Sequence, residues 1–178
     1  LVLNPWNLDS LIRYEDEVPV IVSTILQLRL HPAIKALKNR VKKSKLNKKF
    51  DIDLTYITSR GQWYMQSWKG NDDKSGGIAT NIGVHFFDML SFVFGQVQDV
   101  KVAHRSPTKA VGYLEYEKAR VRWFLSIDIS DIPSSLQKER VRTYRSISMD
   151  GEVSNGFNKT SLEPWASRNR LVAPKDCT

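Results

Sequence analysis

The amino-acid sequence predicts an α+β fold, an open and largely antiparallel sheet of about six strands with helices on one face. Strand-like runs follow one another in series, and helical patterns are inserted singly instead of alternating with the strands. This order disfavours a doubly wound sheet. In addition, no G-x-G-x-x-G turn stands between a strand and a helix anywhere in the 178 residues, so the sequence shows no Rossmann domain.

The first third of the chain predicts two helices with a strand between them. The first helix runs over Pro5–Glu17, because Asn4 is a favourable N-cap and proline is well tolerated at the first helical position. The segment Val20–Arg29 is rich in β-branched residues and is therefore predicted to be a strand. The helix predicted over Pro32–Lys43 again begins with proline.

From residue 50 onward, strands dominate. Apolar and polar residues alternate through Phe50–Tyr56, as expected of a strand with one solvent-facing side. A single helix is predicted within Ser75–Gly95, where apolar residues recur at helical spacing. Further strands are predicted at Val97–His104, Val111–Glu117, Arg120–Asp128 and Thr143–Met149, and the second and third of these form a hairpin that turns near Lys118.

The predicted hairpin carries mixed side chains on the face that the helices leave uncovered. Tyr113, Glu115, Arg122, Phe124 and Ser126 stand at alternate positions and therefore share that face. Aromatic and charged groups together are common at subunit interfaces. They also occur on ordinary solvated surfaces, so both interpretations stay open.

The helix within Ser75–Gly95 has one polar stripe. Asn81, His85 and Asp88 are spaced i, i+4 and i+7, and so lie on one side of a continuous helix. The apolar positions Ile82, Phe86, Met89, Leu90 and Val93 form a second stripe that can pack on a sheet. His85 is then presented to a cleft, while Asp88 holds the helix in place or tunes the imidazole. An ordinary amphipathic helix with a locally paired histidine is the alternative.

A loop rich in aromatic and cationic residues precedes this helix. Arg60, Tyr64, Trp68 and Lys74 are the candidate substrate-binding residues, because aromatic rings accept the apolar face of a sugar or uracil and cations bind carboxylate or phosphate. In the alternative interpretation, Trp63 and Trp68 anchor the loop to the core. Its position beside His85 favours the binding role.

Four stretches of the sequence resemble the Gfo/Idh/MocA oxidoreductase family. They are LVLNPWNLD, LQLRLHP, SRGQWY followed by SWKG, and SGGIATNIGVHFFD, the last of which is similar to the family signature G-G-x-x-x-[DN]-x-G-x-H-x-x-D. The similarity runs from Leu1 to about Gly156. Within the family it points to the subgroup that oxidises the C3 hydroxyl of UDP-N-acetylglucosaminuronic acid with NAD, in bacterial lipopolysaccharide biosynthesis.

This resemblance implies a division of labour. His85 would be the base that removes the hydroxyl proton, together with a lysine of the family's E-K-P motif, which this sequence lacks. Many members carry aspartate where this chain has Asn81; an amide does not titrate, so Asn81 would orient a hydroxyl or that lysine and bind substrate. NAD would be bound mainly by the missing Rossmann domain, and the chain alone would be inactive.

The expected organisation follows from the same resemblance. Residues 1–17 are a linker helix after the missing Rossmann domain, and residues 18–156 are a substrate-binding and oligomerisation sheet domain. Residues 157–178 are an irregular tail without an assigned role. Subunits of the family pack their sheets face to face, so we expect a homo-oligomer formed through the uncovered sheet face.

Composition limits the remaining classes of function. The one cysteine, Cys177, and three scattered histidines make a disulfide framework or a metal site unexpected. No membrane-length apolar run or signal peptide stands out, so a cytoplasmic protein without membrane contact is expected. The net charge of +8 is concentrated in Lys35–Lys49, which we interpret as a solvated helix face and basic loop. The alternative function is a basic binding module for nucleic acid or an acidic protein.

Overall fold

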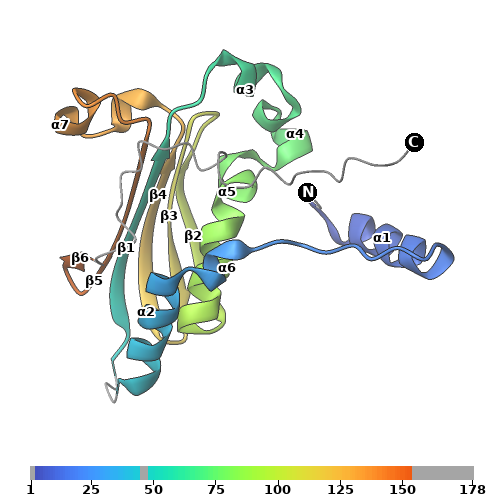
Figure 1. Ribbon diagram of the computed structural model, residues 1–178, viewed down its shortest axis with the longest axis horizontal. Helices are drawn as coiled ribbons and strands as arrows, with labels where there is room; N and C mark the ends of the chain where they lie inside the picture. Colours follow the sequence, from blue (N-terminus) through green and yellow to red (C-terminus); the bar gives the residue numbers. More distant parts are fainter. Residues whose placement is uncertain (1–2, 45–47, 154–178) are drawn as a thin grey trace, which may run out of the picture.

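The computed structural model describes residues 3–44 and 48–153, which form a six-stranded sheet with helices on one face (Figure 1). The strand order is β2-β3-β4-β1-β5-β6. The strands are β1 (Phe50–Thr58), β2 (Val97–Arg105), β3 (Lys109–Tyr116), β4 (Ala119–Ser126), β5 (Thr143–Met149) and β6 (Glu152–Val153). The predicted fold class is confirmed.

The sheet is antiparallel except at its centre. β1 pairs in parallel with β4, with Leu54 opposite Trp123, and antiparallel with β5. The β2–β3, β3–β4 and β5–β6 pairs are all antiparallel. The parallel pair arises because the chain leaves β1, crosses the helical face, and builds the β2–β3–β4 meander before it returns beside β1.

The helices α1 and α2 precede β1 in the sequence, and the other helices lie between strands. The longer ones are α1 (Pro5–Glu17), α2 (Pro32–Lys43) and α6 (Gly83–Phe94). Short helices α3 (Gln62–Gln66), α4 (Asp72–Ser75) and α5 (Gly77–Asn81) precede α6, and α7 (Ser134–Gln137) precedes β5. Three 3-10 turns complete the described part of the chain, namely η1 (Gln27–Leu30), η2 (Trp68–Gly70) and η3 (Ile129–Asp131).

The core fills the space between the sheet and the α2 and α6 helices. α2 buries Ile34, Leu37 and Val41, at the helical spacing i, i+3, i+7, and keeps its basic side chains outside. From the sheet, the inward side chains of β1, β3 and β4 complete the core, including Ile52, Leu54, Leu114, Val121, Trp123 and Leu125. The opposite sheet face lies free of helices (Figure 1).

The predicted strand Val20–Arg29 is wrong. Residues 20–26 are extended but pair with no strand, and the chain then turns through η1. Ile21 is 89% exposed and Ile25 74%. A β-branched composition favours a strand only where another strand lies beside it to pair with, and none of the described strands does here. The sheet's sixth strand is instead β6, a two-residue strand at the edge.

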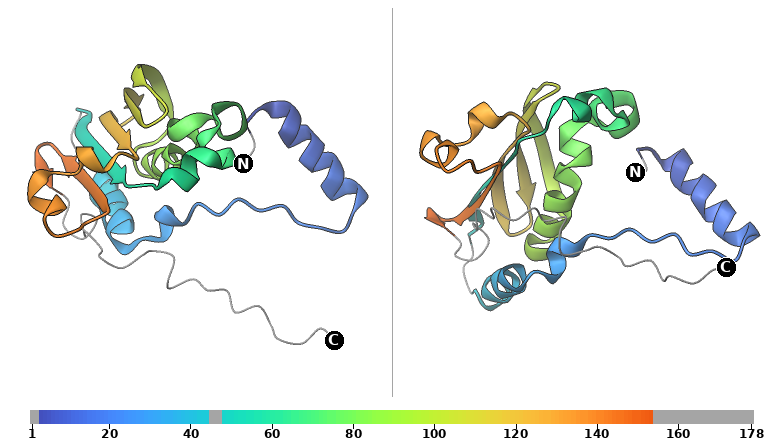
Figure 2. Two further views of the ribbon diagram at one scale, coloured as in Figure 1. Left: turned by 90° about the horizontal axis from the view of Figure 1, so that it is seen from above. Right: turned by 45° about the horizontal axis from the view of Figure 1, so that its top comes forward.

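The helix α1 has the predicted bounds but stands away from the sheet in every view (Figures 1 and 2). It buries none of its residues, and Trp6, Leu8, Ile12 and Tyr14 are each about half exposed or more. The assignment of residues 1–17 as a linker helix stays a prediction. The predicted tail, residues 157–178, lies outside the described residues.

The single helix predicted within Ser75–Gly95 is a broken one. α5 ends at Asn81, and α6 begins at Gly83 after a bend of 43°. Of the described helices, none is by itself long and apolar enough to cross a membrane; the bent pair Asp72–Asn81 and Gly83–Phe94 reaches that length and composition only when taken together.

Candidate active site

Two consecutive glycines redirect the chain into the segment that carries His85. Gly76 has φ +72° and ends α4, and Gly77 has φ +74° and opens α5. Both values lie in the left-handed region that favours glycine. A Cβ atom on Gly76 would lie 2.7 Å from the side chain of Thr80. The Gly pair of the signature is therefore a backbone requirement for the α4–α5 turn.

The α6 helix packs on the sheet through the predicted apolar stripe. Ile82, Phe86, Met89, Leu90 and Val93 are all buried. At the start of the helix, a Cβ atom on Gly83 would lie 3.0 Å from Leu125 and 2.6 Å from Phe87. Glycine there lets α6 approach β4 closely, so the first turn of α6 is held at a defined position over the sheet.

His85 lies in this first turn of α6. The residue is partly buried, and it forms no hydrogen bond or ion pair with any other described residue. The alternative of a locally paired histidine therefore finds no support in residues 3–44 and 48–153. An imidazole on a rigid helix with both nitrogens uncommitted is suited to exchange a proton with a bound molecule.

Asp88 takes part in a structural contact one turn further along α6. Arg29 Nε donates to Asp88 Oδ2 at 2.7 Å, and a second guanidinium nitrogen binds Asp88 Oδ1. This two-point ion pair raises the pKa of Arg29 chiefly through the hydrogen bond to Asp88. Asp88 thus fastens η1 to α6, which favours the first of the two roles expected for it. Arg29 itself was not expected from the sequence, where it lies 59 residues away.

Asn81 contacts the aromatic loop. Its Nδ2 donates to the hydroxyl of Tyr64 at 3.1 Å. Because the bend at Ile82 separates α5 from α6, Asn81, His85 and Asp88 do not lie on one continuous helix. It stands at the C-terminal end of α5, partly buried.

The loop exposes its two tryptophans and buries its tyrosine. Trp63 and Trp68 are 54% and 48% exposed, so they do not anchor the loop in the core. Lys69 Nζ lies 5.9 Å from the Trp63 ring centroid and 5.8 Å from the Trp68 centroid. Tyr64 is the anchor, with only 2% exposure, so its ring offers no surface to a ligand.

The two cationic candidates are exposed. Arg60 follows β1, where its backbone N–H donates to Ile127 O at 3.2 Å. Lys74 lies on α4. Neither side chain forms an ion pair with another described residue. By contrast, Asp72, which lies on α4 with Lys74, pairs with Arg105 of β2 at 2.9 Å. The structure brings Tyr64 and Asn81 into contact. Trp68, Arg60 and Lys74 are exposed, and among the described residues no hydrogen bond or ion pair joins them to His85.

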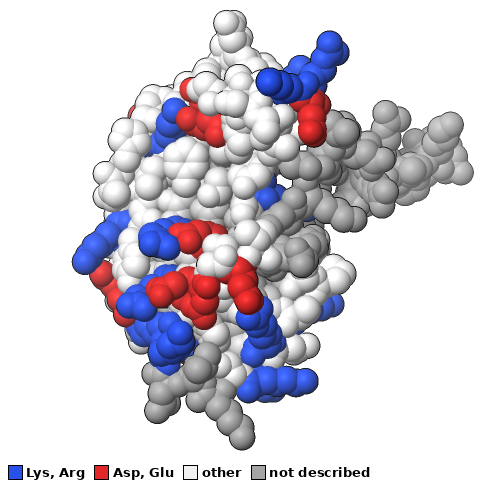
Figure 3. All heavy atoms as spheres, turned by 90° about the vertical axis from the view of Figure 1, so that its left-hand side faces the viewer, with Lys and Arg blue, Asp and Glu red and all other residues white. Residues whose placement is uncertain are grey.

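The open sheet face carries paired charges across adjacent strands (Figure 3). Arg122 Nε binds Asp53 Oδ1 at 2.6 Å and its second nitrogen binds Oδ2 at 2.9 Å, while Arg120 Nε lies 3.0 Å from Asp51 Oδ1. Arg120, Arg122, Asp51 and Tyr113 line a shallow hollow of about 400 Å³. This hollow belongs to the open face, and not to the His85 region.

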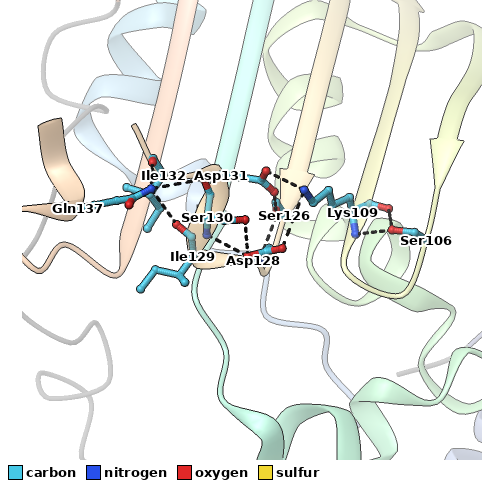
Figure 4. Close-up of polar contacts among 9 residues, drawn as sticks. All are labelled: Ser106, Lys109, Ser126, Asp128, Ile129, Ser130, Asp131, Ile132 and Gln137. Carbon is cyan, nitrogen blue, oxygen red and sulfur yellow. Dashed lines mark hydrogen bonds and ion pairs between the residues drawn. The ribbon is translucent and has the colours of Figure 1, made fainter. Parts of the chain in front are cut away.

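The predicted composition of that face needs one correction. Ser126 is 1% exposed, because η3 folds over the end of β4 (Figure 4). Its hydroxyl donates to Asp131 Oδ2 at 2.6 Å, and Asp131 Oδ1 also accepts from Lys109 Nζ at 2.8 Å. This network covers the end of β4, so Ser126 does not contribute to the open face.

Among the described residues, no group of three His, Cys, Asp or Glu side chains is placed to hold a metal ion. Nor does a glycine-rich turn join a strand to a following helix in the described part, where β1 leads into α3 through Ser59, Arg60 and Gly61. A dinucleotide would therefore need a cradle from outside these residues.

Residues 38–152 match the family model described as the oxidoreductase family, C-terminal alpha/beta domain. The chain belongs to the Gfo/Idh/MocA oxidoreductase family. The matched range contains the sheet, the aromatic loop and His85, so every candidate site residue lies inside it.

Solved structures agree with this assignment. The WlbA (WbpB) dehydrogenase of Thermus thermophilus in complex with NAD and alpha-ketoglutarate is 52% identical over 86% of this chain, with a TM-score of 0.76. The same enzyme in complex with NAD and UDP-GlcNAcA is 49% identical over 90% of this chain, with a TM-score of 0.78. The chain spans 49% and 52% of those two chains, or about half their length. The Bordetella pertussis WlbA dehydrogenase, 20% identical over 78% of this chain and 40% of its own, shares the fold with a TM-score of 0.58.

Proposed function

We propose that this chain is the substrate-binding and catalytic C-terminal domain of an NAD-dependent nucleotide-sugar dehydrogenase. Its reaction would be oxidation of the C3 hydroxyl of UDP-N-acetylglucosaminuronic acid in surface-polysaccharide biosynthesis. The observation that carries the proposal is His85, held on the first turn of α6 with no partner among the described residues. The match to a dehydrogenase solved with NAD and UDP-GlcNAcA supplies the substrate class.

Oxidation of a secondary alcohol separates a proton from a hydride. NAD, when bound, accepts the hydride from the carbon atom. His85 would take the proton from the hydroxyl oxygen, since a neutral imidazole is a suitable general base. Asn81 would hold that hydroxyl in place through its amide. This chain would thus position the hydroxyl and remove its proton, and another domain would bind the dinucleotide.

The loop surface around α3, η2 and α4 would bind the rest of the substrate. Trp68 would stack on the uracil or the sugar, and Arg60 and Lys74 would bind the pyrophosphate and the carboxylate. These binding roles are supported by the exposure of the three side chains and by the lack of ion pairs between Arg60 or Lys74 and other described residues. The basic-module alternative has no comparable support, because the family model that matches residues 38–152 describes an oxidoreductase domain.

The proposal also includes the assembly, location and partners of the protein. The open sheet face would form a homo-oligomer interface, and the enzyme would act in the cytoplasm, where nucleotide sugars are made. Neither membrane nor nucleic acid would be a partner.

A chimera tests the proposed activity. The chain would be joined to the portion of the Thermus thermophilus dehydrogenase that lies outside the match, and NADH formation would be followed with UDP-N-acetylglucosaminuronic acid. We expect turnover from the chimera, and no saturable NAD binding in calorimetry of the isolated chain. Micromolar NAD affinity of the isolated chain would contradict the division of labour.

The His85→Asn variant of this chimera tests the catalytic base. We expect kcat to fall about 10²- to 10⁴-fold, the usual contribution of a positioned acid or base. Stability should change by less than about 1 kcal/mol, because the side chain is outside the buried stripe. His104→Asn, on the exposed strand β2, is the matched control and should retain full activity. Unfolding of the His85 variant, with normal turnover of its folded fraction, would make His85 a structural residue.

A further inference from the structure

Tyr64 is a polar residue buried where the loop meets the catalytic segment. Its side chain is 2% exposed and belongs to the hydrophobic core cluster, yet its hydroxyl accepts a hydrogen bond from Asn81 Nδ2 at 3.1 Å. A buried phenol ordinarily requires a polar partner, because an unpaired hydroxyl is costly inside a protein. Asn81 is that partner, so the two side chains depend on each other.

The backbone around Tyr64 is held by contacts on both sides. Its N–H donates to Gly61 O at 3.0 Å, and its carbonyl accepts from Ser67 Oγ at 2.8 Å. Gly70 packs against the same turn so closely that a Cβ atom there would lie 2.6 Å from Met65 Cα. The Trp63 ring meets the Tyr64 ring edge-on at 5.8 Å. The hydroxyl therefore occupies a defined position.

A fixed hydroxyl determines the orientation of the Asn81 amide. A carboxamide carries one acceptor oxygen and one NH₂ group on the same plane, so directing Nδ2 at Tyr64 directs Oδ1 away from it. Asn81 Oδ1 accepts no hydrogen bond from another described residue. The acceptor end of Asn81 is thus left available on the segment that leads into His85.

We propose that Tyr64 is a positioning residue, which orients the Asn81 amide so that Oδ1 accepts the hydrogen bond of the substrate hydroxyl. This inference rests on the proposed function and deepens it, because it replaces direct contact of Tyr64 with substrate by an indirect role. The reacting hydroxyl then has two acceptors, one that orients it and one, His85, that takes its proton.

Tyr64→Phe removes the hydroxyl and keeps the packed ring. In the chimera, we expect kcat/KM for UDP-N-acetylglucosaminuronic acid to fall about 5- to 10-fold, the usual effect of one neutral hydrogen bond. The loss should vanish in an Asn81→Ala background, because Tyr64 acts only through Asn81. An undiminished loss in that background would overturn the proposal, since Tyr64 would then act on something else.

Tyr116→Phe is the matched control. Tyr116 is also fully buried, and its hydroxyl donates to Phe87 O at 3.4 Å on the same α6 helix that carries His85. Tyr116→Phe should leave kcat/KM unchanged at equal folded fraction. An equal loss in both variants would mean that α6 packing, and not the Asn81 amide, is responsible.

A readout independent of activity separates this inference from the proposed function. In the chain labelled with ¹⁵N-asparagine, Tyr64→Phe should shift the side-chain NH₂ resonances of Asn81, which are assigned by their loss in Asn81→Asp. Tyr116→Phe should leave them in place. Unmoved resonances in Tyr64→Phe would overturn the inference even if the chimera is active, whereas an inactive chimera with shifted resonances would refute the proposed function alone.

Discussion

His31 illustrates how one side chain links local structure to pH. It is the N-cap of α2, and its Nδ1 accepts the backbone N–H of Ala33 at 3.2 Å. That bond requires an unprotonated nitrogen. Burial lowers the pKa of His31, and the positive charge of Arg145 lowers it further. His31 directly precedes the helix predicted over Pro32–Lys43, but the sequence carries no information about its proximity to Arg145.

The direction of this shift predicts acid sensitivity. Above pH of about 6.5, His31 is neutral in the folded and the unfolded chain, and its stabilising effect is fully present. As the pH falls below that value, the unfolded chain takes up the proton first, so stability declines until the folded pKa is passed. His31→Asn keeps a capping side chain without titration and should flatten this decline. Thermal unfolding between about pH 7 and 5 measures it; His104→Asn is the control, and a parallel decline in His31→Asn would contradict the prediction.

The Gly76–Gly77 turn between α4 and α5 orients the segment that leads to His85. Gly76→Ala would place a Cβ in the left-handed region and within 2.7 Å of Thr80. Gly151 has a similar φ of +84°, but a Cβ atom added to it would have no other heavy atom within 4 Å beyond its chain neighbours. Alanine substitutions at Gly76 and Gly151 therefore distinguish the cost of backbone strain alone from the added cost of a steric clash.

We expect Gly151→Ala to cost about 1–2 kcal/mol, the price of a left-handed alanine, and Gly76→Ala to cost clearly more. Urea unfolding of the two variants measures both values. Equal losses would mean that Thr80 moves aside without cost. In the chimera, Gly76→Ala should also lower kcat, because the turn positions α5 and α6.

At the scale of the whole molecule, the open sheet face is the surface to test. Its ion pairs join neighbouring strands, and the side chains remain accessible; Arg122 is 70% exposed and Asp53 47%. Such surface pairs contribute little to the stability of one subunit. A two-fold axis across this face would instead let each subunit's arginines meet the partner's acidic groups.

We therefore expect sedimentation to find a dimer or larger assembly at tens of micromolar, roughly the range in which weak interfaces form. Arg122→Glu should shift the protein to monomer, while Lys42→Glu, on the exposed side of α2, should not. A wild-type chain that stays monomeric, or an assembly that Arg122→Glu leaves intact, would remove the open face as the interface.

Local patterns in the sequence were sufficient for the longer helices and strands. The helices α1 and α2 and the strand β5 have the predicted bounds, because N-caps, proline at the first helical position and short-range periodicity act within a few residues. The buried side of α6 was predicted correctly for the same reason. The signature around His85 also identified the family before any contact was known.

Tertiary structure determined what depends on distant partners. Residues 20–26 have strand composition but no neighbour, and β6 became the sixth strand through pairing with β5. The bend at Ile82 places Asn81 and His85 on two different helices, and Asp88 pairs with Arg29. Tyr64 is buried in the core, while both tryptophans of its loop are about half exposed. Each of these outcomes depends on which groups packing brings together across tens of residues. Short-range periodicity carries no record of such contacts, whereas burial and hydrogen bonding in the folded chain select among them.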